Sequence, residues 1–114
     1  MDDITFEEFK KLDIRVAKVL DAQEIAGADK LYLLTVDIGS ETRTLVAGIK
    51  AYYPEREALI GRKVVVLVNL APKTIRGVES HGMILAASWE PEPGARNVGI
   101  LTVEKDIPPG SPVS

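Results

Sequence analysis

The 114-residue sequence contains no cysteine and only one histidine, His81. Without thiols the chain can form neither disulfides nor thiolate metal sites, which suits a reducing compartment, so we expect a cytoplasmic protein. The sequence also lacks the HExxH, GxSxG and P-loop patterns, which accompany metal-dependent, serine-nucleophile and phosphate-binding chemistry. We therefore expect a protein that is not an enzyme and that uses no metal ion or cofactor.

Long apolar runs are missing as well. The longest, at residues 64–68, is far shorter than the ~20 residues that a helix needs to cross a bilayer. The N-terminal sequence MDDITFEEF is acidic and has no apolar core, so we expect neither a signal peptide nor a membrane partner. With 46% apolar and 27% charged residues, the composition is that of one globular domain.

Aromatic side chains are few: Phe6, Phe9, Tyr32, Tyr52, Tyr53 and Trp89. Proteins that grip single-stranded nucleic acids stack bases on such side chains, each base contributing about 1–3 kcal/mol. Phe6 and Phe9 lie on a helical stripe and Tyr32 on the inward phase of a predicted strand, so few aromatics remain for stacking. A nucleic-acid partner is therefore expected to be a structured RNA, held through its phosphates and shape.

The charge is negative overall but unevenly spread. The formal net charge of −3 argues against a nucleic-acid partner. Residues 62–82, however, carry four basic side chains and one acidic side chain, which gives 4 − 1 = +3, whereas the chain from residue 90 onward carries two basic and four acidic side chains, or −2. An acidic protein with one positive face is consistent with this distribution.

The N-terminal twelve residues predict a short helix. Thr5 and Glu8 form a capping-box pattern, and Ile4 and Phe9 occupy the two positions of a hydrophobic staple. Phe6, Phe9 and Leu12 recur at helical spacing, so we expect a helix over residues 5–12 that packs on the core through this stripe. A contact with a partner or a second copy is the alternative. We divide the chain into this capping helix, residues 1–12, and one domain, residues 13–114.

The rest of the chain predicts mainly strands. They are expected at residues 13–24 (with a β-bulge where the apolar phase slips between Val16 and Val19), 32–38, 43–48, 63–70 and 83–88, with edge pieces at 99–103 and in the Pro-rich end. The segment PEREAL, closed by Gly61, predicts a helical turn between the third and fourth strands.

Three strands, a short helix and two more strands are the order of an OB-fold, an all-β, five-stranded Greek-key barrel. SH3-like barrels also have five strands, but the intervening helix favours the OB-fold. Such barrels bind oligonucleotides on one face and through the loops after the first and fourth strands. These loops are expected at residues 25–30 and 71–82, and they carry Lys30, Lys73 and Arg76.

Two motifs carry a family likeness. ADKL, at residues 28–31, is followed by NLAPKTIRGVESHGM, at residues 69–83. With the surrounding sequence from about Asp13 to the C-terminus, they resemble the tRNA-binding domain appended to methionyl-tRNA synthetases, its free-standing relatives and the CsaA-type secretion chaperones. The resemblance implies an OB barrel with extra C-terminal strands, binding of tRNA by shape, homodimers among free-standing members, and an aminoacyl-tRNA synthetase as a further partner.

The resemblance also implies a set of tRNA-binding residues: Lys30, Asn69, Lys73, Arg76, Ser80 and Met83. The chain departs from the family pattern at several places. Residues 25–27, Ile-Ala-Gly, replace a usual His-Pro, Thr74 stands where a second basic residue is common, His81 replaces a usual Gln, and Ala17 replaces a frequent Gly.

The residue types leave several of these roles open. Lys73 and Arg76, three residues apart, could both reach one phosphate backbone, or they could be solvated loop charges. Asn69 could cap the loop internally or offer its amide to a ligand, and Ser80 could form a turn with Glu79. Met83 could be part of the core or pack on a ribose or base.

His81 is better explained as a hydrogen-bonding loop residue than as a ligand or catalyst. The leading hypothesis is thus a non-catalytic, shape-specific tRNA-binding module, a homodimer that works detached from, or in trans to, a methionyl-tRNA synthetase. The absence of HIGH and KMSKS sequences excludes formation of an aminoacyl adenylate at a site of that type. A protein-binding module of the export-chaperone kind is the alternative, suggested by the net charge of −3 and the apolar, Pro-rich tail.

Overall fold

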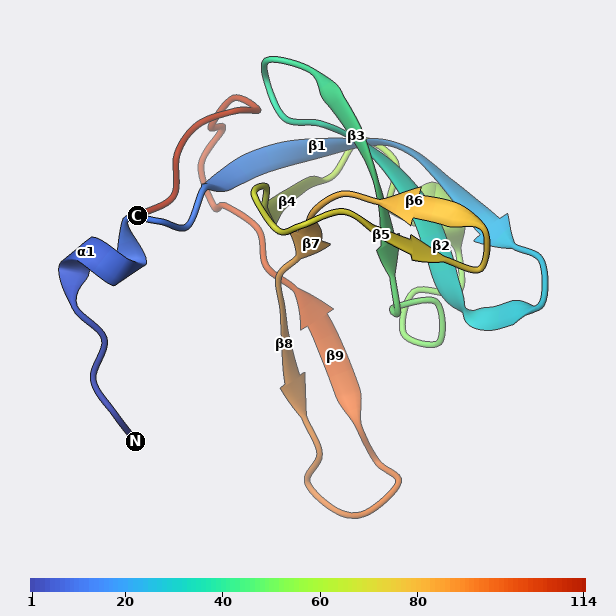
Figure 1. The fold of residues 1–114 in the computed structure, drawn as a ribbon. Coiled ribbons are helices and arrows are strands. Elements are labelled where there is room, and N and C mark those ends of the chain that lie inside the picture. The colour runs from blue at the N-terminus through green and yellow to red at the C-terminus, as the bar shows by residue number, and fades with distance from the viewer.

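The computed structural model describes residues 1–114 and consists mainly of strands (Figure 1). In chain order the elements are α1 (Phe6–Phe9), β1 (Ile14–Ile25), β2 (Ala28–Asp37), β3 (Thr42–Ala47), the 3-10 helix η1 (Arg56–Ala58), β4 (Lys63–Leu67), β5 (Lys73–Ile75), β6 (Val78–Ser80), β7 (Met83–Ile84), β8 (Ala86–Trp89) and β9 (Asn97–Ile100). No helix has the length and apolarity that crossing a membrane requires.

Five strands form one antiparallel sheet in the order β3-β2-β1-β4-β7, and the sheet curls into a small barrel. The alternation along β2 puts the side chains of Tyr32, Leu34 and Val36 inside, where each is 0% exposed. Three consecutive valines of β4, residues 64–66, are buried as well, as expected for a strand covered on both faces. The predicted OB-fold, with its helical turn before the fourth strand, is confirmed.

The irregularity in β1 lies later than predicted. The pairing of β1 with β2 shifts between Val19 and Asp21, not between Val16 and Val19. Val16 and Ala17 are both buried, and Val19 alternates with Ala17 at the usual spacing of two residues. The pairing with β4 runs without a shift from Ile14 to Lys18, so no extra residue is inserted in this part of β1. The bulge lets β1 turn from β4, which it pairs along Ile14 to Lys18, to β2 farther along the chain.

The barrel is closed where β6 meets β3. The backbone N–H of Val46 donates to Oγ of Ser80 at 2.9 Å, and the N–H of His81 donates to the carbonyl of Thr44 at 2.9 Å. The hydroxyl of Thr44 donates to the carbonyl of Glu79 at 3.0 Å. The hydroxyl of Ser80 thus pairs an N–H on the edge of β3 that would otherwise be left open.

The expected fifth strand, residues 83–88, is in fact two strands. β7 pairs with β4, whereas β8 leaves the sheet and pairs with β9 in a separate hairpin that projects from the barrel (Figure 1). Every residue of β8 is exposed. The prediction of one continuous strand was therefore wrong, because β8 takes its hydrogen-bonding partner from β9 and not from the barrel.

The Pro-rich C-terminal segment covers the edge of β1 that β2 leaves free. Backbone hydrogen bonds join Gly110, Ser111 and Val113 to Val16 and Ile14 at 2.7–2.9 Å. Gly110 passes so close to Gly39 that a Cβ on Gly110 would lie 2.8 Å from the Cα of Gly39. The edge piece expected in the Pro-rich end is therefore present and pairs with β1.

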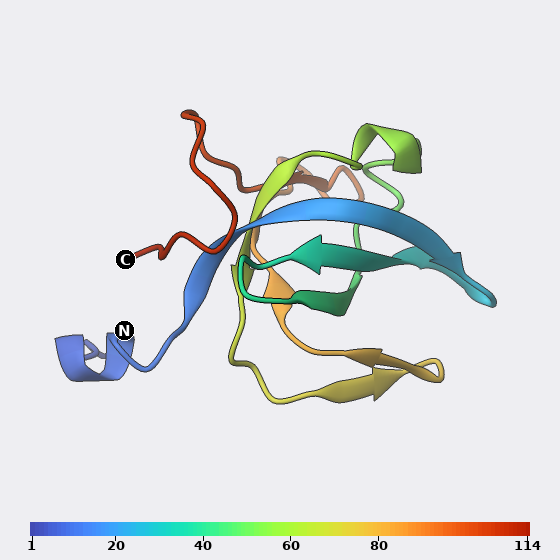
Figure 2. The ribbon, with the colours of Figure 1, turned by 90° about the horizontal axis from the view of Figure 1, so that it is seen from above.

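The N-terminal helix is shorter and more exposed than predicted. Its capping box is present, with the N–H of Thr5 donating to Oε1 of Glu8 at 3.1 Å and the N–H of Glu8 to Oγ1 of Thr5 at 3.2 Å. The apolar stripe, however, does not pack on the core: Phe6 is 69% and Leu12 44% exposed. Figures 1 and 2 show α1 standing apart from the barrel.

Candidate nucleic-acid interface

The predicted loop at residues 71–82 is a β-hairpin, β5–β6, which pairs Lys73 with Ser80 and Ile75 with Val78. Its turn consists of Arg76 and Gly77, which have φ angles of 53° and 80°. Positive φ at both central residues is what a tight two-residue turn of type I′ requires. The sequence signals this hairpin only through Gly77 between Ile75 and Val78, because both strands are short and contain Lys73 and Glu79, residue types that are depleted in strands.

The other predicted loop, residues 25–30, is also shorter than expected. β1 ends at Ile25 and β2 begins at Ala28, so only two residues form the turn and Lys30 lies on a strand. The tip of the β5–β6 hairpin approaches this turn: a methyl group placed on Gly27 would lie 3.9 Å from Nη1 of Arg76. Figures 1 and 2 show both turns at the same end of the barrel.

Three clefts surround this end of the molecule. The tip cleft, about 370 Å³, is lined by residues 27–31 and by Arg76. The hairpin cleft, about 360 Å³, is lined by residues that include Lys73, Ser80 and Met83. The large cleft, about 560 Å³, is lined by residues that include both Lys30 and Met83. Shared lining residues make the clefts neighbours, so five of the six predicted site residues come together here.

Five cations of the barrel domain, Arg15, Arg43, Lys50, Arg56 and Lys63, are paired with carboxylates, but those that line the clefts are not. Nζ of Lys50 lies 2.9 Å from Oε1 of Glu24, and this hydrogen bond raises the pKa of Lys50 and lowers the pKa of Glu24. Lys30, Lys73 and Arg76, by contrast, form no ion pair within 4.0 Å.

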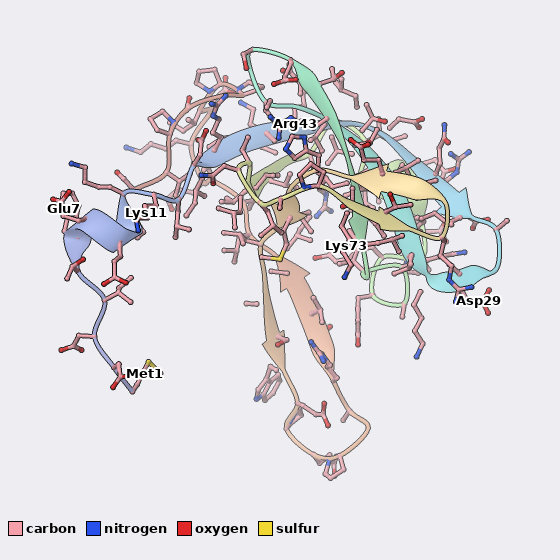
Figure 3. The ribbon with its side chains drawn as sticks, in the orientation of Figure 1. Met1, Glu7, Lys11, Asp29, Arg43 and Lys73 are labelled. Atoms are coloured by element: carbon pink, nitrogen blue, oxygen red, sulfur yellow. The ribbon has the colours of Figure 1, made fainter.

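Asp29 is the one carboxylate that lines a cleft, at the rim of the tip cleft. Figure 3 shows Lys73 and Asp29 on the barrel, on the side opposite Glu7 and Lys11 of the N-terminal segment. The three unpaired cations outnumber the two carboxylates of residues 25–30 and 71–82, Asp29 and Glu79, and this balance favours an anionic group such as phosphate.

Asn69, the sixth predicted residue, lines none of the three clefts. Its Oδ1 accepts from the N–H of Asp13 at 2.8 Å, and its Nδ2 donates to the carbonyl of Lys11 at 2.6 Å. The side chain therefore ties the linker after α1 to the end of β4, which is the internal cap that the sequence left as one of two alternatives. A contact between Asn69 and tRNA stays a prediction.

Ser80 and Met83 line the clefts in different ways. Ser80 is 7% exposed and its hydroxyl is the acceptor that closes the barrel, so its main role is structural. Met83 is 44% exposed and lies where the hairpin cleft meets the large cleft. Its flexible thioether is available to a ligand at that position. His81 is half-buried and lines no cleft.

The sequence did not point to the far wall of the large cleft. This wall is formed by the segment after β3, with Ile49 and Tyr52, and by Arg96 and Val98 from the β8–β9 hairpin. Arg96 lies in a Pro- and Gly-rich stretch that predicts a turn. Nothing in the local pattern indicates that this turn folds back beside β3, because that approach depends on the long-range path of β8.

Comparison with known proteins gives consistent matches. Residues 14–112 match the family described as "Putative tRNA binding domain". The chain is 45% identical over 113 residues to a methionine–tRNA ligase from Pyrococcus horikoshii, covering 99% of this chain but 15% of that relative. The chain thus spans about 15% of the length of the curated relatives that it matches first.

Solved structures show the same architecture. A MetRS related protein from Pyrococcus horikoshii is similar with a TM-score of 0.88 and 38% identity, and the match covers 100% of both chains. The chaperone CsaA from Bacillus anthracis is similar with a TM-score of 0.84 and 31% identity, covering 99% of this chain and 100% of that one.

The closing contact at Ser80 gives a direct test of its structural role. Ser80→Ala leaves the part-buried N–H of Val46 without its acceptor, and an unsatisfied donor shielded from water costs about 1–3 kcal/mol. We expect denaturant unfolding to show a loss of that size. Ser88→Ala, on exposed β8, is the matched control and should change the free energy of unfolding by less than about 0.5 kcal/mol. Equal stability of the two variants would contradict a structural role for the Ser80 hydroxyl.

Proposed function

The chain belongs to the tRNA-binding domain family, and we propose that it is a non-catalytic module that binds tRNA by its shape. The observation that carries this proposal is the set of unpaired cations Lys30, Lys73 and Arg76 around adjoining clefts at one end of the barrel. Lys and Arg contacts to phosphate supply affinity and register without reading sequence. The predicted RNA-contacting set also includes Asn69, Ser80 and Met83.

The secondary-structure elements that carry these three cations support recognition of RNA shape. Lys73 lies on β5 and Lys30 on β2, so two of the three cations stand on strands. Arg76 occupies a turn of only two residues. Short, hydrogen-bonded elements fix the backbone positions from which these charges extend, and this fixed backbone spacing favours a folded RNA whose phosphates match it.

The biological setting that fits is tRNA supply to an aminoacyl-tRNA synthetase in the cytoplasm. The ligases among the relatives are about seven times longer than this chain, since it covers 15% of their length. We propose that the module, residues 13–114, acts detached from or in trans to a methionyl-tRNA synthetase and raises the local tRNA concentration for it. On this view, aminoacylation is the synthetase's activity and not the module's.

A homodimer is part of the proposal. Ile4 and Phe6, beside and on α1, are 65% and 69% exposed, and Trp89 on the β8–β9 hairpin is 69% exposed. Exposed apolar groups of this size on projecting elements are suited to a second copy of the chain. Two modest tRNA sites in one dimer would gain affinity by avidity if one tRNA spans both.

The second candidate function is protein binding of the chaperone kind. It is favoured by the similarity to the chaperone CsaA and by the apolar lining of the large cleft, where 9 of 12 residues are hydrophobic. A client protein would depend on this apolar surface, whereas tRNA binding would depend first on Lys30, Lys73 and Arg76.

The tRNA proposal predicts salt-dependent binding that charge reversal abolishes. We expect bulk tRNA to bind with micromolar affinity in filter assays, with the log of the affinity falling against log salt with a slope of about −2 to −4. Lys73→Glu/Arg76→Glu should weaken binding more than tenfold and reduce the slope by about 2, because each of the two cations neutralises one phosphate in the complex.

The matched control is Arg62→Glu/Lys105→Glu, which changes the net charge equally at residues that line none of the clefts. It should keep most of the affinity. No retention of tRNA by the wild type at low salt would reject the proposal. If, in addition, the wild type and the Lys73/Arg76 variant suppressed aggregation of a model client equally, the chaperone function would be favoured.

The dimer is tested by sedimentation equilibrium. We expect a species of twice the 12.4 kDa chain mass, and we expect Phe6→Ser/Trp89→Ser to shift it toward the monomer, because polar side chains remove the apolar surface. Leu20→Ser, at an exposed apolar residue of β1, is the control. A wild type that sediments as a monomer at working concentrations would overturn this part of the proposal.

A further inference from the structure

The large cleft carries features that phosphate binding does not require. It lies between the segment after β3, strand β7 and the start of β9, and its apolar lining includes Ile49, Ile84 and Val98. Its volume of about 560 Å³ falls within the range of about 300–1,000 Å³ that is usual for small-molecule sites. Apolar walls of this kind bury a ligand's surface, whereas a phosphate backbone would stay in solvent.

The charged groups of this cleft have one sign. Lys30 and Arg96 line it, and no carboxylate does. Neither cation is engaged in an ion pair, although the chain as a whole has three more acidic than basic residues. An apolar cleft with two unpaired cations is complementary to a ligand that is flat and apolar in one part and anionic in another.

Tyr52 supplies the aromatic surface. It is the one aromatic residue that lines any of the three clefts. The other two tyrosines are committed to the fold: the hydroxyl of Tyr32 donates to the carbonyl of Tyr53 at 2.7 Å, and the hydroxyl of Tyr53 accepts from the N–H of Ile100 at 3.0 Å. Tyr52 is half-buried and its hydroxyl has no hydrogen-bond partner within the chain.

We propose that the large cleft receives one unpaired nucleotide of the bound RNA, with its base against the ring of Tyr52 and its phosphate facing Lys30 and Arg96. This inference rests on the proposed function and adds a single stacking position to it. Lys30 lines both the large cleft and the tip cleft. An RNA backbone whose phosphates contact Arg76 could therefore place its next unpaired base in the large cleft while it stays beside Lys30.

A nucleotide fits the lining better than an apolar peptide segment does. A base stacked on an aromatic ring contributes about 1–3 kcal/mol, and an adjacent phosphate gives Lys30 and Arg96 a partner. An apolar peptide would fill the apolar part of the cleft but would leave Lys30 and Arg96 unpaired. One aromatic residue provides for one base only, which agrees with a mainly folded RNA and not with a single strand.

Substitutions of Tyr52 test the inference with bulk tRNA as the probe. Tyr52→Leu keeps an apolar wall but removes the ring, and we expect about tenfold weaker binding with an unchanged salt slope, because stacking releases no counterions. Tyr52→Phe keeps the ring and should bind within about twofold of the wild type. Thermal unfolding of both variants checks that the fold is retained.

Arg96→Gln tests the proposed contact between Arg96 and the phosphate. It can be used even if Tyr52→Leu folds poorly. It should reduce the salt slope by about 1, whereas Lys105→Gln, at a residue outside the clefts, should not. Binding by Tyr52→Leu as tight as that of the wild type would overturn the inference and leave the tRNA-binding proposal standing. Failure of the wild type to bind tRNA would overturn both.

Discussion

The attachment of the β5–β6 hairpin to β3 is the contact on which the rest of the site depends. The hydrogen bond from the N–H of Val46 to Oγ of Ser80, at 2.9 Å, joins the hairpin to the barrel where the sheet would otherwise stay open. Ser80 is cross-strand from Lys73, so the same contact fixes a cation. It also brings Arg76 over the β1–β2 turn and beside Lys30. Closure of the barrel and assembly of the positive surface are therefore one structural event.

The distribution of ion pairs explains how an acidic chain can present such a surface. Arg15, Lys50 and Lys63 are held by neighbouring carboxylates. The hydrogen bond from Nζ of Lys63 to Oδ1 of Asp106 also lowers the pKa of Asp106. Two of these pairs, Lys50 with Glu24 and Lys63 with Asp106, join segments far apart in the sequence, whereas the cations that line the clefts have no carboxylate partner. Net charge describes the whole molecule, whereas binding depends on the local field.

Short-range patterns predicted the barrel well. The alternation along β2, the continuous apolar run of β4 and the four-residue capping box of α1 are all short-range patterns, and all are present. Five of the six residues that the family motifs predict for the site line one set of clefts, and their contact with tRNA stays a prediction. What the sequence missed depends on long-range geometry: the burial of the Ser80 hydroxyl, the exposure of α1, and the return of Arg96 to the wall beside Tyr52.

The central claim is that tRNA is held by the end of the barrel that carries the hairpin tip and the β1–β2 turn. Amide hydrogen exchange of the protein with and without bulk tRNA tests it most directly. The account predicts slower exchange at residues 26–31 and 73–80 and unchanged exchange at the C-terminal segment, residues 110–113. Slower exchange confined to the C-terminal segment or to α1, with none at the two turns, would contradict it.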